Sequence, residues 1–118
     1  MSKRTLEQYF GAMRSHEWQR LAGCLAADVV RTGPFLDVVR GREAYVSFLS
    51  KVVPTLKNYQ LEVLRIHETL DGSAFVELRE TLDVDGQSTT FPEAIFFAFD
   101  DRERIREVSV YLQRPPGS

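Results

Sequence analysis

AFVELRETLDV, residues 74–84, decides the fold, because apolar and polar side chains alternate along it. A period of two predicts a β-strand with one face against a core. Glu80 interrupts the apolar face, since it shares the parity of Val76 and Leu78. Burying a charge is costly unless the group is paired, hydrogen-bonded or protonated. We therefore interpret Glu80 as the mark of a cavity with a polar function.

Further strand-like stretches lie on both sides of this one. They cover residues 59–70, 87–99 and 105–113. Asp85-Gly86 predicts a two-residue hairpin turn, and long strands joined by short turns predict an antiparallel meander. In the first stretch the apolar parity switches between Val63 and Leu64, which indicates a β-bulge. A bulge bends a sheet, and a bent sheet can enclose a pocket.

The N-terminal half predicts helices. Apolar residues recur at helical spacing over residues 6–13, 18–25 and 42–53. Pro54 ends the last of these helices. Residues 29–32 predict a short strand that ends at Gly33-Pro34, and a loop follows as far as Gly41. The chain thus predicts helices first and a meander after them.

Length and composition indicate one globular domain over residues 1–118. The chain has 43% hydrophobic and 27% charged residues, which is enough to bury one core. Its net charge of -2, with Lys and Arg scattered, argues against a nucleic-acid partner. Cys24 is the only cysteine, so no internal disulfide can form and a cytoplasmic location fits best. No apolar run is long enough for a membrane span or an export signal.

Several short motifs, in this order of elements, resemble a known superfamily. They are LAADVV at 25–30, RGREA at 40–44, FFAFDD at 96–101 and VSVYL at 108–112. Together they resemble the nuclear transport factor 2-like superfamily, which includes SnoaL-like polyketide cyclases and ketosteroid isomerases. The resemblance implies a cystatin-like α+β cone, in which a curved antiparallel sheet wraps around N-terminal helices and an internal cavity. It also implies a homodimer through the outer face of the sheet.

The sequence departs from the ketosteroid isomerase pattern at two of three positions. The resemblance would place an aspartate base directly before the proline of the first strand's turn, where this chain has Gly33. It would place a second carboxylic acid at the position of Ile95, and a tyrosine at that of Tyr9. Because both acids are missing, steroid isomerisation by that mechanism is not expected.

A second acidic residue shares the inner face with Glu80. Reflection about the Asp85-Gly86 turn places Glu80 opposite Phe91 and Leu78 opposite Glu93. Glu80 and Glu93 would then be diagonal neighbours, with backbones roughly 7 to 8 Å apart. Two carboxyls in an apolar pocket cannot both ionise cheaply, so one would donate a proton and the other accept it. Alternatively, Glu93 lies at the rim in solvent.

Other residues are candidates for substrate binding, each with a structural alternative. Arg31 has the strand parity that would point it into the pocket, where it could neutralise Glu80, or it could extend outwards to solvent. Tyr9 and Trp18 lie on helical apolar stripes, so they could line the cavity or simply fill the core. Asp37, on the loop that borders the cone mouth in the superfamily, is a minor candidate base.

The leading hypothesis is a small-molecule-binding protein that acts as an acid–base enzyme of isomerase, cyclase, dehydratase or epoxide-hydrolase type. Its ligand would be mostly apolar, of polyketide, terpenoid or steroid-like kind. His16 and His67 lack partners at metal-ligand spacing, so we expect neither a metal nor another cofactor. The alternative is a non-catalytic ligand-binding or dimerisation module. Phe96 and Ala98 make the third long strand apolar on both faces, which favours a homodimer.

Overall fold

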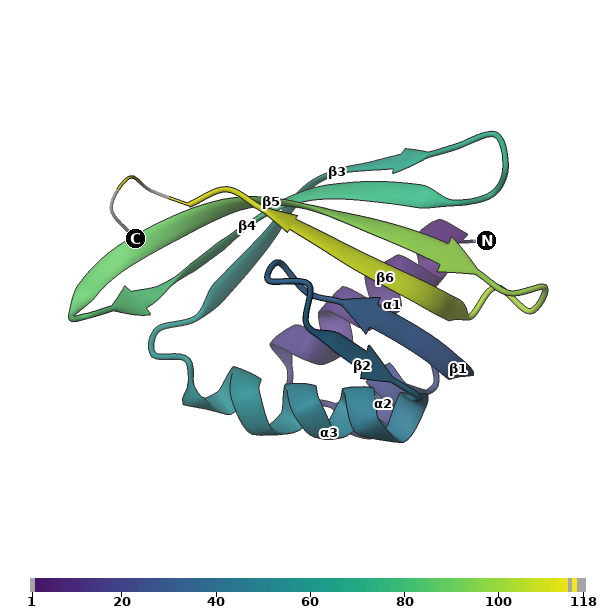
Figure 1. Cartoon of the computed structure of the whole chain (residues 1–118), viewed down its shortest axis with the longest axis horizontal. Coiled ribbons are helices and arrows are strands. Elements are labelled where there is room, and N and C mark those ends of the chain that lie inside the picture. The colour runs from purple at the N-terminus through teal and green to yellow at the C-terminus, as the bar shows by residue number, and fades with distance from the viewer. Residues whose placement is uncertain (1, 115, 117–118) are drawn as a thin grey trace.

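The fold is a layer of helices packed against one face of a curved sheet (Figure 1). The computed structural model describes residues 2–114 and 116. The helices are α1 (Ser2–Arg14), α2 (Trp18–Ala22), α3 (Arg42–Val52) and the short 3-10 helix η1 (Val53–Thr55). The strands are β1 (Leu25–Thr32), β2 (Val38–Arg40), β3 (Gln60–Glu68), β4 (Ala74–Val84), β5 (Gln87–Phe99) and β6 (Ile105–Leu112). Among the described residues, no helix is long and apolar enough to cross a membrane.

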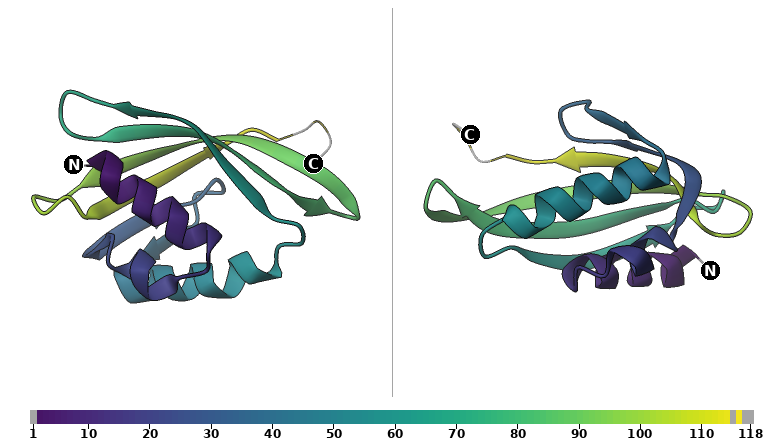
Figure 2. Two further views of the ribbon diagram at one scale, coloured as in Figure 1. Left: turned by 180° about the vertical axis from the view of Figure 1, so that it is seen from behind. Right: turned by 90° about the horizontal axis from the view of Figure 1, so that it is seen from below.

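Within residues 2–114, six strands form one sheet in the order β2-β1-β6-β5-β4-β3. Neighbouring strands are antiparallel except β1 and β6, which run parallel. The sheet curves over the helices, which lie on one side of it (Figure 2). This arrangement confirms the predicted α+β class with its curved sheet and N-terminal helices. The sheet differs from the expectation in being mixed rather than purely antiparallel.

The β4–β5 hairpin has the predicted bounds, turn and register. Asp85 and Gly86 both have positive φ, at 51° and 79°, as a type I′ turn requires. Glu80 pairs with Phe91, and Leu78 pairs with Glu93. The predicted bulge in β3 is also present, because the pairing of β3 with β4 shifts register between Val63 and Arg65.

Two predictions for the N-terminal half were wrong. β1 begins at Leu25 rather than at residue 29, so the second helix ends early, at Ala22, and Cys24 lies outside it. Residues 38–40, expected to be a loop, form β2 and pair with the end of β1. The pairing that starts β1 early is distant in sequence, whereas β2 folds back on the neighbouring end of β1. Leu25 pairs in parallel with Ile105, a contact that local periodicity cannot reveal.

The core lies between the helices and the concave face of the sheet. Tyr9 and Phe10 of α1 pack edge-on against Phe97 of β5, with ring centroids 5.7 and 5.9 Å from it. On β4 the alternation is as expected, since Val76 and Leu78 are buried and Phe75 is 40% exposed on the outer face. The strand parity therefore decides which β4 side chains look towards the helices, and Glu80 is among them.

Candidate functional site

Two adjoining hollows lie on the helix side of the sheet. The first, which we call the inner cavity, has a volume of about 140 Å³ and a mostly apolar wall from α1, α3 and the long strands. Its polar wall residues are Tyr9, Arg31, Tyr45, Tyr59, Glu80 and Glu93. The second has a volume of about 230 Å³, and Arg31, Glu80, Glu93 and Val110 line both hollows. We call the second hollow the mouth, because it continues the inner cavity outwards.

Glu80 and Glu93 form a pair of neighbouring carboxyl groups in this wall. Glu93 is only 9% exposed. Burial raises the pKa of Glu93 well above its usual range, and the hydrogen bond with Glu80 and the charge of that carboxylate add to the rise. The Arg31 charge opposes the rise without cancelling it. Glu93 therefore keeps its proton at neutral pH and donates it to Glu80.

One oxygen of the pair has no partner. Oε2 of Glu93 is buried, and no N–H or hydroxyl group of a described residue donates a hydrogen bond to it. A buried polar atom without a partner costs free energy, so its retention at this position calls for an explanation. A ligand group in the inner cavity would supply the missing hydrogen bond.

Tyr59 orients the second carboxylate. Its hydroxyl donates a short hydrogen bond to Oε2 of Glu80. Burial raises the pKa of Tyr59, and the neighbouring Glu80 raises it further, so the phenol remains a donor. Strand parity in the sequence indicates this residue. Tyr59 has the same parity as Leu61, which pairs with Glu80.

A second hydrogen-bonded pair lies deeper between the helices. Tyr9 of α1 and Tyr45 of α3 share a short hydrogen bond between their hydroxyls, and both side chains are buried. Burial raises the pKa of each phenol, while the Arg31 charge acts in the opposite direction. Tyr9 lines the inner cavity and is also part of the core, the two alternatives that the sequence left open. Its partner Tyr45 lies in the helix expected over residues 42–53 and was not among the candidate site residues.

Arg31 and Asp37 form an ion pair beside the mouth. Nη1 of Arg31 lies 3.2 Å from Oδ2 of Asp37, and its guanidinium stacks on the Phe48 ring at 4.9 Å. The Arg31 side chain is 13% exposed and that of Asp37 is 46% exposed. Desolvation acts to raise the pKa of Asp37, but hydrogen bonds from backbone N–H groups and the Arg31 charge outweigh it and lower the pKa.

Gly33 leaves the space that this ion pair needs. A Cβ at position 33 would lie 2.6 Å from Oδ2 of Asp37 and 2.7 Å from Nη1 of Arg31. The volume that a side chain at position 33 would fill is therefore taken by the Asp37 carboxylate. The chain has no acid at position 33, but it delivers one to the same place from four residues further on.

Trp18 stands apart from the other candidates. Its ring stacks on His16 with centroids 5.5 Å apart, and its body packs against the core. It is not among the residues that line the inner cavity or the mouth. Within the described part of the chain, no three His, Cys, Asp or Glu side chains are grouped so as to hold a metal ion.

Comparison with known proteins places this geometry in a family. The family described as SnoaL-like domain matches residues 6–108. The chain belongs to the SnoaL-like domain family. Comparison with curated proteins finds no significant match.

Solved structures of SnoaL-like and related proteins share the fold. A SnoaL-like polyketide cyclase candidate from Shewanella denitrificans OS-217 is 15% identical, covers 95% of this chain and 90% of its own, and has a TM-score of 0.81. An LEH-like epoxide hydrolase from M. tuberculosis is 19% identical, with 95% and 82% covered and a TM-score of 0.78. A protein of unknown function with a cystatin-like fold from Methylobium petroleophilum PM1 is 16% identical, with 99% and 78% covered and a TM-score of 0.82. At these identities the likeness shows the fold alone, so the activity has to be argued from the residues of the site.

We predict that Glu93→Gln stabilises the protein at and above neutral pH. The pKa of Glu93 is higher in the folded chain than in the unfolded chain, where it is about 4.3. Its proton therefore favours folding at low pH, and this contribution is lost as the pH rises towards the folded pKa. The free energy of unfolding of wild type minus that of the variant should fall from about pH 6 to about pH 9, by up to about 1.4 kcal/mol per unit. Urea unfolding at each pH measures it.

Glu77→Gln is the matched control for this experiment. Glu77 lies on the outer face of β4, where a hydrogen bond from Arg65 lowers its pKa, so it is ionised throughout this pH range. Its variant should follow the wild-type pH dependence. Parallel curves for wild type and Glu93→Gln would show that Glu93 is ionised in the folded protein, contrary to our assignment.

We predict that Gly33→Ala is destabilising because of the Asp37 carboxylate. The added methyl group would overlap that carboxylate and Arg31, at a cost of about 1–3 kcal/mol. In an Asp37→Ala background the same change should cost at least about 1 kcal/mol less. A double-mutant cycle by urea unfolding measures the coupling, and a cost equal in both backgrounds would contradict the packing that we describe.

Proposed function

We propose that this SnoaL-like protein binds a mostly apolar small molecule in the inner cavity and catalyses proton transfer on it. The observation that carries this proposal is the buried Oε2 of Glu93, which receives no hydrogen bond from a donor group of the described residues and lies in the cavity wall beside the Glu80 carboxyl. The two hollows have volumes of about 140 and 230 Å³, which favours the smaller terpenoid- or polyketide-like ligands over larger ones.

The pair supplies both halves of an acid–base reaction. On ligand binding, the proton of Glu93 would move from its contact with Glu80 to an oxygen of the ligand, which frees Glu80 to take a proton from a carbon atom or from an attacking water. The hydrogen bond between the two carboxyls then returns the proton from Glu80 to Glu93 and restores the starting state. Tyr59 would hold Glu80 in place through both steps. Isomerisation, cyclisation, dehydration and epoxide opening each need such a donor and acceptor.

The names of two structural relatives support this class of chemistry. One is a candidate polyketide cyclase and another an epoxide hydrolase. Both reactions act on oxygen-bearing, largely apolar molecules. The proposal for this chain rests on its own carboxyl pair, because the sequence identity to these relatives is below 20%.

A non-catalytic ligand-binding or dimerisation module is the second candidate. The observation in its favour is that most polar groups of the site satisfy one another. Tyr59 bonds to Glu80, Tyr9 bonds to Tyr45, and Arg31 pairs with Asp37. Such closed pairs would also serve to neutralise charge beside a passive cavity.

We predict that Glu93→Gln and Glu80→Gln each lower kcat by about 10²- to 10⁴-fold, because each removes one half of the proton transfer. KM should change much less, since the neutral amide keeps the shape of the side chain. The assay is turnover of a panel of apolar epoxides and β,γ-unsaturated ketones, followed by mass spectrometry and by absorbance.

Glu77→Gln, on the opposite face of the same strand, should keep the wild-type rate. If wild type binds panel members in a thermal-shift assay but turns none over, the non-catalytic module is the better account. Undiminished turnover in both site variants would remove Glu80 and Glu93 from the mechanism.

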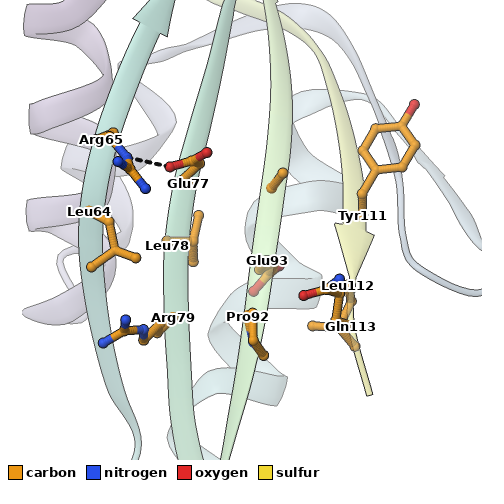
Figure 3. A pocket seen from close by; sticks show the side chains of 11 residues that line it. Leu64, Arg65, Glu77, Leu78, Arg79, Pro92, Glu93, Tyr111, Leu112 and Gln113 are labelled. Carbon is orange, nitrogen blue, oxygen red and sulfur yellow. Dashed lines mark hydrogen bonds and ion pairs between the residues drawn. The ribbon is translucent and has the colours of Figure 1, made fainter. Parts of the chain in front are cut away.

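We also propose that two copies associate through the outer face of the sheet. Phe75 and Phe96 are neighbours there, with ring centroids 5.1 Å apart, and Tyr111 is 61% exposed. The outer face is also hollowed by a groove of about 510 Å³ (Figure 3). The ion pair of Arg65 with Glu77 lies along this groove, so a second copy would meet both apolar and charged groups.

We predict a mass of twice the chain at micromolar concentration by light scattering after gel filtration. Phe75→Arg should reduce it to that of one chain, because it places a charge in the proposed contact. Leu70→Arg is the control, since Leu70 is fully exposed in the β3–β4 turn, away from this face. A wild-type protein that stays monomeric at this concentration would overturn the dimer.

A further inference from the structure

Two arginines line the mouth from different parts of the chain. Arg31 comes from β1, and Arg114 follows the end of β6. Glu80 and Glu93, like Arg31, line both the mouth and the inner cavity, whereas Arg114 lines the mouth alone. The remaining lining is apolar, from Pro34, Leu82, Phe91, Val110 and Leu112. A ligand in the mouth would therefore contact an apolar wall that carries two arginine side chains.

An aromatic ring holds each of these guanidinium groups in place. Arg31 stacks on Phe48 at 4.9 Å, and Arg114 stacks on Phe35 at 4.1 Å from the ring centroid. Stacking uses the face of the guanidinium and leaves the N–H edge free to donate. Each guanidinium group therefore has an aromatic neighbour beside the mouth.

Both arginines have donors to spare. A guanidinium carries five N–H donors. Arg31 spends one nitrogen on Asp37, whose side chain is 46% exposed, and another contact on Tyr45. No carboxylate of a described residue lies within ion-pair distance of Arg114, which leaves its edge available. An oxyanion is the group that such a pair recognises best.

We propose that the natural ligand is an amphiphile with one acidic group, a carboxylate or a similar small oxyanion, held in the mouth by Arg114 and Arg31 while its apolar body lies towards the inner cavity. The inference rests on the proposed function, since it concerns the same cavity and the same ligand. The carboxylate of Glu80 would repel the acidic group from the deep end and so fixes which way round the ligand enters.

Asp37 has a defined part in this arrangement. Without ligand it is the anion that neutralises Arg31, and with ligand it competes for the same guanidinium. Removing its charge while keeping its shape should therefore strengthen binding of an acid. Removing the charge of Arg114 should weaken it. Opposite effects from two neighbouring substitutions distinguish a specific contact from a general loss of structure.

The test uses probes that share one skeleton and differ in charge. These are 4-phenylbutyrate, 4-phenylbutyramide and 4-phenylbutylamine, with dissociation constants measured by calorimetry at pH 7.5 and low salt. For wild type we expect the acid to bind about tenfold more tightly than the amide, and the amine to bind most weakly. Arg114→Gln should reduce the acid to about the affinity of the amide, and Asp37→Asn should strengthen the acid by about threefold or more.

Arg4→Gln is the matched control, because it removes the same charge from the exposed side of α1, away from the mouth. Its acid-to-amide ratio should equal that of wild type. Equal binding of acid and amide, a preference for the amine, or a ratio in Arg114→Gln that matches Arg4→Gln would each overturn this inference and leave the proposed function standing. If no probe binds at millimolar concentration, the cavity does not take an apolar ligand, and the proposed function falls together with the inference.

Discussion

The proton shared by Glu80 and Glu93 is the interaction on which the site depends. Two neighbouring carboxylates in a mostly apolar wall would repel each other, and burial would add a desolvation cost to both. Retaining one proton removes the repulsion and turns it into a hydrogen bond. The site then carries a proton donor and a proton acceptor at neutral pH. The stability that this proton contributes is also the reason why the folded state should weaken as the solution becomes alkaline.

The pair exists because the β4–β5 hairpin has one register only. A two-residue turn at Asp85-Gly86 needs positive φ at both positions, and a shift by one residue would turn every side chain of one strand to the other face. Glu93 would then lie outside, beside Tyr111, with Glu80 alone in the cavity. A turn more than ten ångströms along the chain from these carboxyls thus controls whether they share a face, and through this it controls the pKa of Glu93.

Counting from a turn is also why this part of the site could be predicted from the sequence. Alternation and the turn pair together predict the hairpin, its bounds, and the shared face of Glu80 and Glu93. The bulge in β3 was equally local, since it shows as a switch of parity. The parallel pairing of β1 with β6 was not predictable in this way, because its partners are about 80 residues apart in the chain and no short-range pattern links them. The early start of β1 follows from that pairing, because Leu25 pairs with Ile105.

Contacts between side chains of different helices and loops could not be predicted from the sequence either. Tyr45 lies in α3, and only the folded structure brings its hydroxyl to that of Tyr9 in α1. At Gly33, the sequence has no acid where the ketosteroid isomerase pattern would place an aspartate. In space, the Asp37 carboxylate fills the place that a side chain at position 33 would occupy, and Arg31 holds it there. A family pattern compares residues at equivalent sequence positions, whereas a ligand in the mouth contacts whichever side chain occupies that place in space. A glycine can therefore mark the place where another residue's charge enters the site, rather than the loss of that charge.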